Sequence, residues 1–129
     1  MITIYGELYS SKNSKQIVKR GDKPFLIASN AYLAHKKPIQ QQLVYERFKW
    51  SMEKVGAVKP LKIEFKIYRK TKRKFDYVNI IQGLLDCMTE CGWIDDDNAD
   101  EVIPVFAPYE VDKKNPRVEI KIKKDEKSC

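Results

Sequence analysis

Residues 61–97 read LKIEFKIYRKTKRKFDYVNIIQGLLDCMTECGWIDDD, and the expected fold follows from the change of pattern within them. Apolar and polar side chains alternate at the start, which predicts a strand over 61–68 with one buried face. Apolar side chains then recur at helical spacing, which predicts an amphipathic helix over 79–91 that ends at Gly92. Residues 95–98 follow as an acidic turn.

Weaker patterns on either side of this stretch predict the remaining elements. Pro38 is expected to start a second helix and Gly56 to stop it. Pro104 places its strand at a sheet edge or at a bulge, because proline cannot donate a hydrogen bond to a neighbouring strand. The remaining expected elements are strands over 2–9, 102–106 and 117–122, a helix over 38–55, loops over 10–15 and 107–116, and a frayed tail over 123–129.

The pattern as a whole predicts one domain over residues 1–129. A chain of 129 residues is long enough to bury a single core without disulfides or metals. The sequence contains no internal repeat and no linker. We therefore expect an α+β fold in which a small mixed sheet of four or five strands packs with two main helices.

Composition narrows the possible partners. Twenty-five Lys and Arg residues against eighteen Asp and Glu residues give a net charge of +7, which favours a polyanionic partner, although charge alone is weak evidence. No leader opens the chain and no apolar run approaches the ~20 residues of a membrane span, so we expect a cytoplasmic protein without a membrane partner. Cys87, Cys91 and Cys129 are expected as reduced thiols, because their number is odd and zinc needs about four ligands.

Residues 69–98 place a dense run of cations beside several carboxylates. Phosphodiester hydrolysis uses this combination, because lysines and arginines hold the non-reacting phosphates while carboxylates hold magnesium beside the reacting one. Magnesium prefers oxygen ligands, so neither histidine nor cysteine is required, and manganese accepts the same ligands. The loop over 10–15 carries two further lysines, Lys12 and Lys15, which either are solvated or contact phosphate.

The carboxylates meet only if the chain folds back after the helix. Asp76 lies just before the expected helix, and Asp86 lies about two and a half turns along its polar face. Asp96 and Asp97 lie in the turn beyond Gly92, and nothing in the periodicity requires that turn to return along the helix. In the alternative interpretation, Asp76 is a carboxylate favourable to the helix dipole, Asp86 is solvated, and the aspartate run is an ordinary turn.

The order of these residues resembles a known motif. A basic run is followed by Asp-x-x-Asn, an amphipathic helix with a further aspartate, a glycine, an aromatic residue and an aspartate pair. This order is similar to that of the RusA family of phage and bacterial Holliday-junction resolvases. Asp76, Asn79, Asp86 and the pair Asp96 and Asp97 fall on matching positions, and the rest of the chain resembles the family more loosely.

The resemblance implies a fold, an activity and a partner. Members of the family are compact α+β homodimers that use magnesium, without an organic cofactor, to cut two strands symmetrically across a four-way DNA junction. The source it implies is a bacterial cell or a phage or prophage. The implied catalytic residues are Asp76, Asp86, Asp96 and Asp97, and the implied metal ligands are Asp76, Asp96 and Asp97. The implied DNA-binding residues are Lys12, Lys15, Lys70, Lys72, Arg73, Lys74 and Asn79.

Two positions depart from the family pattern. Val78 stands where the family usually has the second aspartate of its first pair, and Gln82 stands where it usually has a lysine. A valine cannot bind a metal, and a glutamine lacks the positive charge of a lysine. Three explanations stay open: Asp86 or Asp95 takes over the missing role, cutting proceeds with a reduced metal site, or catalysis is lost while DNA binding persists.

We therefore expect a magnesium-dependent endodeoxyribonuclease that binds and nicks branched DNA in recombination and repair. The alternative is a DNA-binding member of the same family that does not cut, and Val78 and Gln82 are its best support. A third hypothesis, a basic partner of an acidic protein, does not account for the register of the aspartates.

Overall fold

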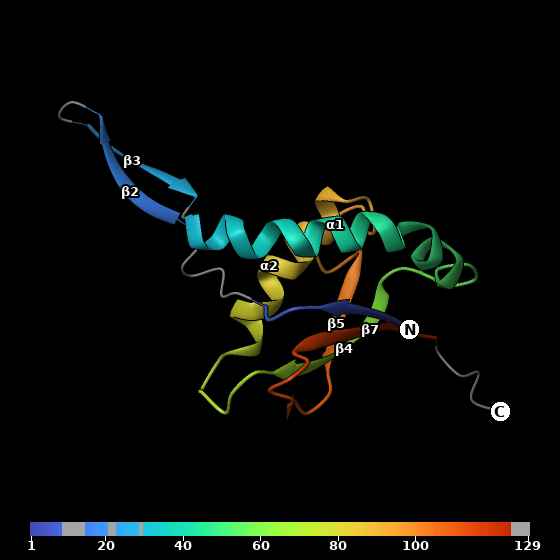
Figure 1. The fold of residues 1–129 in the computed structure, drawn as a ribbon. Helices are drawn as coiled ribbons and strands as arrows, with labels where there is room; N and C mark the ends of the chain where they lie inside the picture. Colours follow the sequence, from blue (N-terminus) through green and yellow to red (C-terminus); the bar gives the residue numbers. More distant parts are fainter. Residues whose placement is uncertain (9–14, 21–22, 29, 125–129) are drawn as a thin grey trace.

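A computed structural model describes residues 1–8, 15–20, 23–28 and 30–124, with side chains for 1–8 and 34–124. In this described part, one five-stranded sheet and two helices form the body of the protein, and a two-stranded hairpin projects from it (Figure 1). The elements are β1 Ile2–Tyr5, β2 Lys15–Arg20, β3 Lys23–Ala28, α1 Asn30–Glu53, β4 Leu61–Arg69, α2 Tyr77–Glu90, β5 Val102–Phe106, β6 Glu110–Val111 and β7 Arg117–Lys123. The expected α+β class is confirmed.

The five-stranded sheet is mixed, as expected. Its order is β1-β7-β4-β5, and the short β6 pairs with the end of β4. β7 runs antiparallel to β1 and β4, whereas β5 and β6 run parallel to β4. β5 lies at an edge of the sheet, which accommodates Pro104 because one side of an edge strand needs no hydrogen-bond donor.

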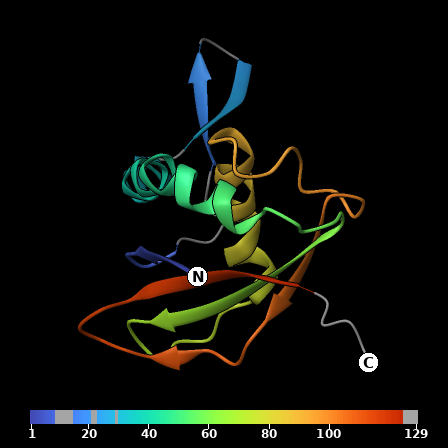
Figure 2. The ribbon, with the colours of Figure 1, turned by 90° about the vertical axis from the view of Figure 1, so that its right-hand side faces the viewer.

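Both helices pack on the same face of the sheet (Figure 2). The buried side chains of β4 alternate along the strand, as the sequence pattern predicts. α2 covers them with one apolar face, whose buried residues are Ile80, Ile81, Leu84, Leu85, Cys87 and Met88. The other face of the sheet is polar, since Glu64 there forms ion pairs with Lys121 at 3.4 Å and Lys123 at 3.1 Å.

α1 begins at Asn30 and continues through Pro38, so the expected start at Pro38 is wrong. Proline removes one backbone hydrogen bond, but contacts with α2 hold the first half of the helix in place. Lys36 forms an ion pair with Glu90 at 3.1 Å, and the Gln40 side chain donates to the other oxygen of Glu90 at 2.7 Å. The buried side chain of Ile39 adds apolar packing beside these contacts.

The remaining differences concern short strands with weak patterns. β1 ends at Tyr5 instead of residue 9, because Gly6 turns the chain with a φ of 113°. β6 lies within the expected loop over 107–116, and the β2–β3 hairpin was not predicted. Lys15 belongs to β2 and Lys123 to β7 rather than to the expected loop and tail. Residues 10–14 and 125–129 lie outside the described residues.

Among the described helices, none has the length and apolar character needed to cross a membrane.

Candidate functional site

The chain reverses direction directly after α2. Gly92 adopts a φ of 78°, which L residues other than glycine rarely take. The Gly92 N–H donates to the carbonyl of Thr89 at 3.2 Å, and the Trp93 N–H donates to the carbonyl of Met88 at 2.9 Å. These two bonds form a Schellman motif, which satisfies the last carbonyls of the helix and turns the chain away from its axis.

Trp93 anchors the returning segment in the core. Its ring stacks on Trp50 of α1 with a centroid distance of 4.6 Å. The Trp93 indole N–H donates to the carbonyl of Leu43 at 2.6 Å, and the Trp50 indole N–H donates to the carbonyl of Trp93 at 2.9 Å. The turn after α2 is therefore fixed to α1 from both sides, and the residues that follow it are led back along α2.

The returning segment meets α2 at Gln82. The Nε2 of Gln82 donates to Oδ1 of Asp86 at 3.0 Å and to Oδ2 of Asp97 at 3.0 Å. One side-chain amide thus joins two carboxylates, one from the helix and one from the loop. The structure brings Asp86 and Asp97 together, although the periodicity of the sequence does not require it.

This arrangement affects the acidity of Asp86. Partial burial raises the pKa of Asp86 because it disfavours the charged carboxylate, and the neighbouring charge of Asp97 acts in the same direction. The hydrogen bond from Gln82 opposes both effects. The neutral amide of Gln82 donates a hydrogen bond to each carboxylate but does not cancel the negative charge of either one.

Asp76 lies at the opposite end of the helix. It is the N-cap of α2, and its Oδ2 accepts a hydrogen bond from the Asn79 side chain at 2.9 Å rather than from a backbone N–H of the first turn. Val78 in the same turn is 69% exposed. Val78, Gln82 and Asp86 are spaced four residues apart, so both departures from the family pattern lie in the row on α2 that leads to Asp86.

The other aspartates of the turn make separate contacts. The Asp97 N–H and the Asn98 side chain donate to Asp96 at 2.8 and 3.1 Å, and these bonds lower the pKa of Asp96. Asp95 pairs with Lys59 at 2.7 Å, which lowers the pKa of Asp95. The Asp95 carboxylate is therefore bound by Lys59 and does not join the contact between Gln82, Asp86 and Asp97.

Within the described part of the chain, no three His, Cys, Asp or Glu residues converge closely enough to hold a metal ion. Magnesium is often bound by only one or two carboxylates together with substrate phosphates, so the donor chemistry of Asp86 and Asp97 suits it. The amide of Gln82 donates to both carboxylates and so lies between them. The assignment of Asp76, Asp96 and Asp97 as ligands stays a prediction.

The basic run lies between β4 and Asp76. Arg69 is buried, with its guanidinium 4.5 Å from the centre of the Phe75 ring and 3.6 Å from Glu7. The remaining cations of the run are exposed and are Lys70, Lys72, Arg73 and Lys74. Lys72 and Lys74 line an open groove of about 470 Å³ together with Phe75, Asp76, Tyr77 and Tyr109.

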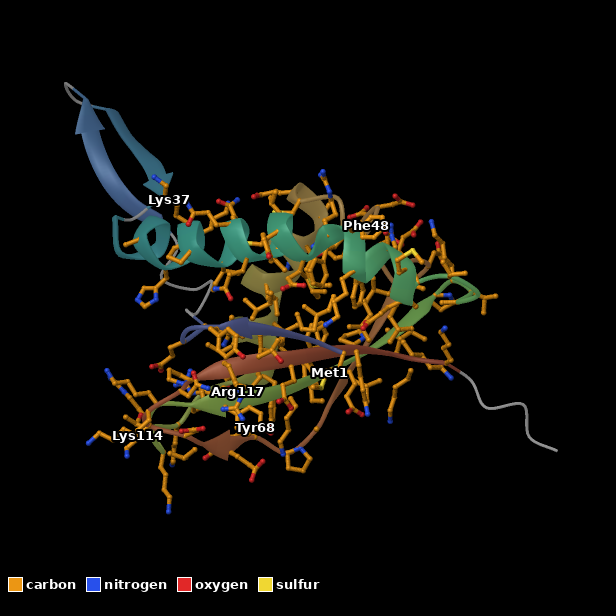
Figure 3. The ribbon with its side chains drawn as sticks, turned by 45° about the vertical axis from the view of Figure 1, so that its right-hand side comes forward. Met1, Lys37, Phe48, Tyr68, Lys114 and Arg117 are labelled. Atoms are coloured by element: carbon orange, nitrogen blue, oxygen red, sulfur yellow. The ribbon has the colours of Figure 1, made fainter. Side chains whose placement is uncertain are left out.

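Pairing within the sheet adds two cations that the sequence analysis did not identify. β6 pairs with the end of β4 through Val111 and Arg69, and the Asp112 N–H donates to the Arg69 carbonyl at 2.8 Å. The following turn carries the exposed residues Lys113 and Lys114, which therefore follow directly on the residues that pair with the start of the basic run. Figure 3 shows Lys114 at the same end of the sheet as Tyr68 and Arg117. About forty residues separate the two groups in sequence, so no local pattern indicates that they share a surface.

The structure gives no side-chain position for two of the predicted DNA-binding lysines, Lys12 and Lys15. Lys12 lies outside the described residues, and the description of Lys15 is limited to its backbone position in β2. Asn79 lies in the first turn of α2, where it bonds to Asp76.

A basic surface beside an acidic helix and turn is an arrangement suited to an enzyme that binds DNA and cuts its phosphodiester bonds. The family model "Endodeoxyribonuclease RusA" matches residues 10–123, which is most of the chain. The protein therefore belongs to the RusA family of endodeoxyribonucleases, whose members act on Holliday junctions. No curated protein matches the chain.

Proposed function

We propose that this protein is a magnesium-dependent, structure-selective endodeoxyribonuclease that nicks branched DNA such as Holliday junctions during recombination and repair. The observation that carries the proposal is the fold-back after α2, which holds Asp97 3.0 Å from Gln82 and beside Asp86. Of the predicted ligands Asp76, Asp96 and Asp97, it is Asp97 that this contact joins to the helix.

The basic groove supplies the DNA contacts in this proposal. Lys72 and Lys74 line it next to Asp76, so a phosphate held by these ammonium groups would lie near the N-terminus of α2. The groove also exposes parts of the Phe75 and Tyr109 rings, which offer flat apolar surface to an unstacked base. Lys113 and Lys114 would extend the contact along the DNA backbone.

In this proposal Asp97 and Asp86 are the carboxylates that would hold magnesium or manganese. Asp76 lies at the opposite end of α2 and Asp96 is bonded within its own turn, so these two remain ligands that only the resemblance implies. When bound, the metal would stabilise the charge that develops on the reacting phosphate and lower the pKa of a bound water. The residues of the chain itself contribute by holding these carboxylates in position. The Schellman turn and the Trp50–Trp93 stack hold the Asp97 segment in place, and Gln82 keeps its carboxylate oriented towards Asp86.

The second candidate function is DNA binding without cleavage. The Gln82 amide favours it, because an amide already placed between Asp86 and Asp97 competes with a cation for the same oxygens. The exposed Val78 adds to this argument, since it brings no oxygen ligand to the first turn of α2. This candidate predicts junction binding with a steep dependence on salt and no product in magnesium.

The experiment that separates the two functions is cleavage of a labelled four-way junction. Purified protein is incubated with the junction, and with linear duplex as a control substrate, in magnesium and again in EDTA. Paired symmetric nicks that require magnesium and the junction would support the nuclease. Junction binding without nicks in either magnesium or manganese would move the assignment to the non-cutting protein.

A pair of variants tests the site itself. Asp97→Asn keeps an oxygen that accepts the Gln82 hydrogen bond but removes the charge, so we expect cleavage to fall by about a hundredfold or more. Asp100→Asn is the matched control, because Asp100 is an exposed aspartate of the same turn. Cleavage that survives in Asp97→Asn, or falls equally in Asp100→Asn, would exclude this acidic pair as the site.

A further inference from the structure

The β2–β3 hairpin forms a sheet of its own. Its two strands pair with each other from Lys15 opposite Ala28 to Arg20 opposite Lys23. Figure 1 and Figure 2 both show the hairpin projecting from the start of α1, away from the five-stranded sheet. A two-stranded hairpin that stands alone is only marginally stable in water. The packing of the body therefore does not explain why this element projects from it.

Apolar and basic residues occupy different parts of the hairpin. The cross-strand pairs in its middle are Ile17 with Leu26 and Val18 with Phe25. Apolar pairs of this kind stabilise a hairpin and keep its strands in register. The two outermost pairs are Lys19 with Pro24 and Arg20 with Lys23. Three cations therefore stand together at the end of the hairpin that lies farthest from α1.

The outermost pair is unfavourable by itself. Arg20 lies directly opposite Lys23 on the antiparallel strands, and like charges in this position destabilise the pairing. Asp22 is the one carboxylate in the sequence between residues 15 and 28, so it balances only part of the positive charge. A polyanion bound to the outer end would remove the repulsion between the cations.

The hairpin and the basic groove belong to opposite ends of α2. β3 ends at Ala28 and α1 begins at Asn30. Lys36, which is about 9 Å further along α1, forms an ion pair at 3.1 Å with Glu90, the last residue of α2. The basic groove lies instead beside Asp76, the N-cap of α2. The two basic surfaces therefore flank this helix, whose 14 residues span about 21 Å.

We propose that the hairpin is a second DNA-binding element, which contacts the phosphate backbone of a duplex arm through Lys19, Arg20 and Lys23. None of these cations is among the DNA-binding residues that the family resemblance implies. Six residues of strand extend about 20 Å, and the major groove of DNA admits a two-stranded ribbon, so phosphates beside the groove lie within reach of the outer end. DNA that contacts both basic surfaces crosses α2, where Gln82 holds Asp86 and Asp97 together.

The inference rests on the DNA binding of the proposed function, and its test separates the two. Fluorescence anisotropy of a labelled four-way junction is measured at several salt concentrations in EDTA, so that no cleavage intervenes. Arg20→Ala combined with Lys23→Ala should make the slope of log K against log salt shallower by about two units, because each phosphate contact contributes about one. The matched control is Arg47→Ala with Lys49→Ala, which also removes one arginine and one lysine, both exposed on α1.

A shallower slope in the hairpin variant and an unchanged slope in the control would support the proposal. An unchanged slope in the hairpin variant would overturn it and would assign the hairpin to a protein partner. An equal change in the control would also overturn it, because overall charge would then explain the result. If Lys72→Ala with Lys74→Ala weakens binding while the hairpin variant does not, the proposed function stands and this inference fails alone.

Hydroxyl-radical footprinting of the same complexes tests whether the two basic surfaces contact different parts of the DNA. The wild-type protein should protect separate stretches of backbone, and the hairpin variant should lose protection of one stretch while it keeps the other. The groove variant, Lys72→Ala with Lys74→Ala, should show the reverse. Circular dichroism melts show whether each variant is folded. Protection that is the same in the wild type and in a folded hairpin variant would overturn the proposal.

Discussion

At the scale of single residues, Gln82 determines how the acidic cluster is held together. Two aspartates close to one another repel, and a cation is the most effective group to place between them. Gln82 instead satisfies both with one neutral amide, at 3.0 Å from each. The family resemblance identifies Gln82 as a departure from lysine, whereas only the structure shows that its amide takes the bridging position.

The raised pKa of Asp86 predicts an effect of pH on stability. Burial and Asp97 raise this pKa in the folded protein above its unfolded value, so the folded state binds the proton more tightly. Folding stability therefore falls as pH rises from the unfolded pKa of about 3.9 through the folded pKa. We expect Asp86→Asn, which keeps an oxygen acceptor for Gln82, to be more stable than the wild type at neutral pH and to lose this advantage in acid.

Thermal unfolding between about pH 3.5 and pH 7 measures this difference. Asp95→Asn is a control of opposite sign, because Lys59 lowers the pKa of Asp95. The Asp95 contribution is present above the unfolded pKa and is lost as pH falls through the lowered folded pKa, so Asp95→Asn should be slightly less stable at neutral pH. If Asp86→Asn is less stable at neutral pH, the Gln82 contact outweighs the cost of burial and our sign is wrong.

At the scale of elements, the sequence patterns correctly predict those helices and strands that depend on residues close together in the sequence. β4, α2, β5 and β7 appear where alternation or helical spacing places them, because each buries one face against the same core. The start of α1 was missed, because contacts with Glu90 of α2 sustain a helix through Pro38. The two residues of β6 are an element only through their pairing with β4, which no local pattern encodes.

The same distinction applies to the candidate site. Gly92 signals the end of α2 in the sequence, but the direction of the chain beyond it depends on the stack of Trp93 on Trp50. These two tryptophans lie 43 residues apart in the chain. The sequence therefore predicts which aspartates are available, and the tertiary packing decides that Asp97 is the one that reaches Gln82.

We expect Gly92→Ala to destabilise the protein by about 1–2 kcal/mol, since its φ of 78° is strained for an L residue. The added methyl group would meet Arg47 Cδ at 3.7 Å, an ordinary contact, so the cost comes from the backbone. Gly56→Ala is the matched control, with a φ of 82° and nothing within 4 Å of the added methyl group. Urea unfolding should give similar losses for both variants.

The two glycine variants should differ at the site. Only Gly92 leads to Asp97, so the NMR signals of the Gln82 side-chain amide should shift in Gly92→Ala and stay unchanged in Gly56→Ala. Equal amide signals in both variants would mean that the Asp97 contact forms independently of the Schellman turn.

At the scale of the whole molecule, the fold gathers apolar, acidic and basic residues, which are intermixed in the sequence, onto separate surfaces. The helices cover one face of the sheet, and ion pairs such as Glu64 with Lys123 cover the other. α1 exposes the large apolar side chains of Tyr45 and Phe48, whereas exposed cations gather where the end of β4 meets the turn after β6. The net charge of +7 is therefore concentrated in part near Asp76, which composition alone does not indicate.

The placement of this basic surface leads to a quantitative prediction for DNA binding. Each phosphate contact releases counterions, so binding weakens with salt in proportion to the number of contacts. Lys72→Ala combined with Lys74→Ala removes two cations from the groove beside Asp76. The slope of log K against log salt should become shallower by about two units, and affinity for a four-way junction should fall at moderate salt.

The matched control removes two cations from the polar face of the sheet, Lys121→Ala with Lys123→Ala, where both lysines already share Glu64. Fluorescence anisotropy of a labelled junction, titrated at several salt concentrations, measures both double variants. Because they lose the same net charge, only the groove variant should change the slope if contact rather than overall charge governs binding. An equal change in both would indicate a general charge effect, and a larger change in the control would place the DNA on the open face of the sheet.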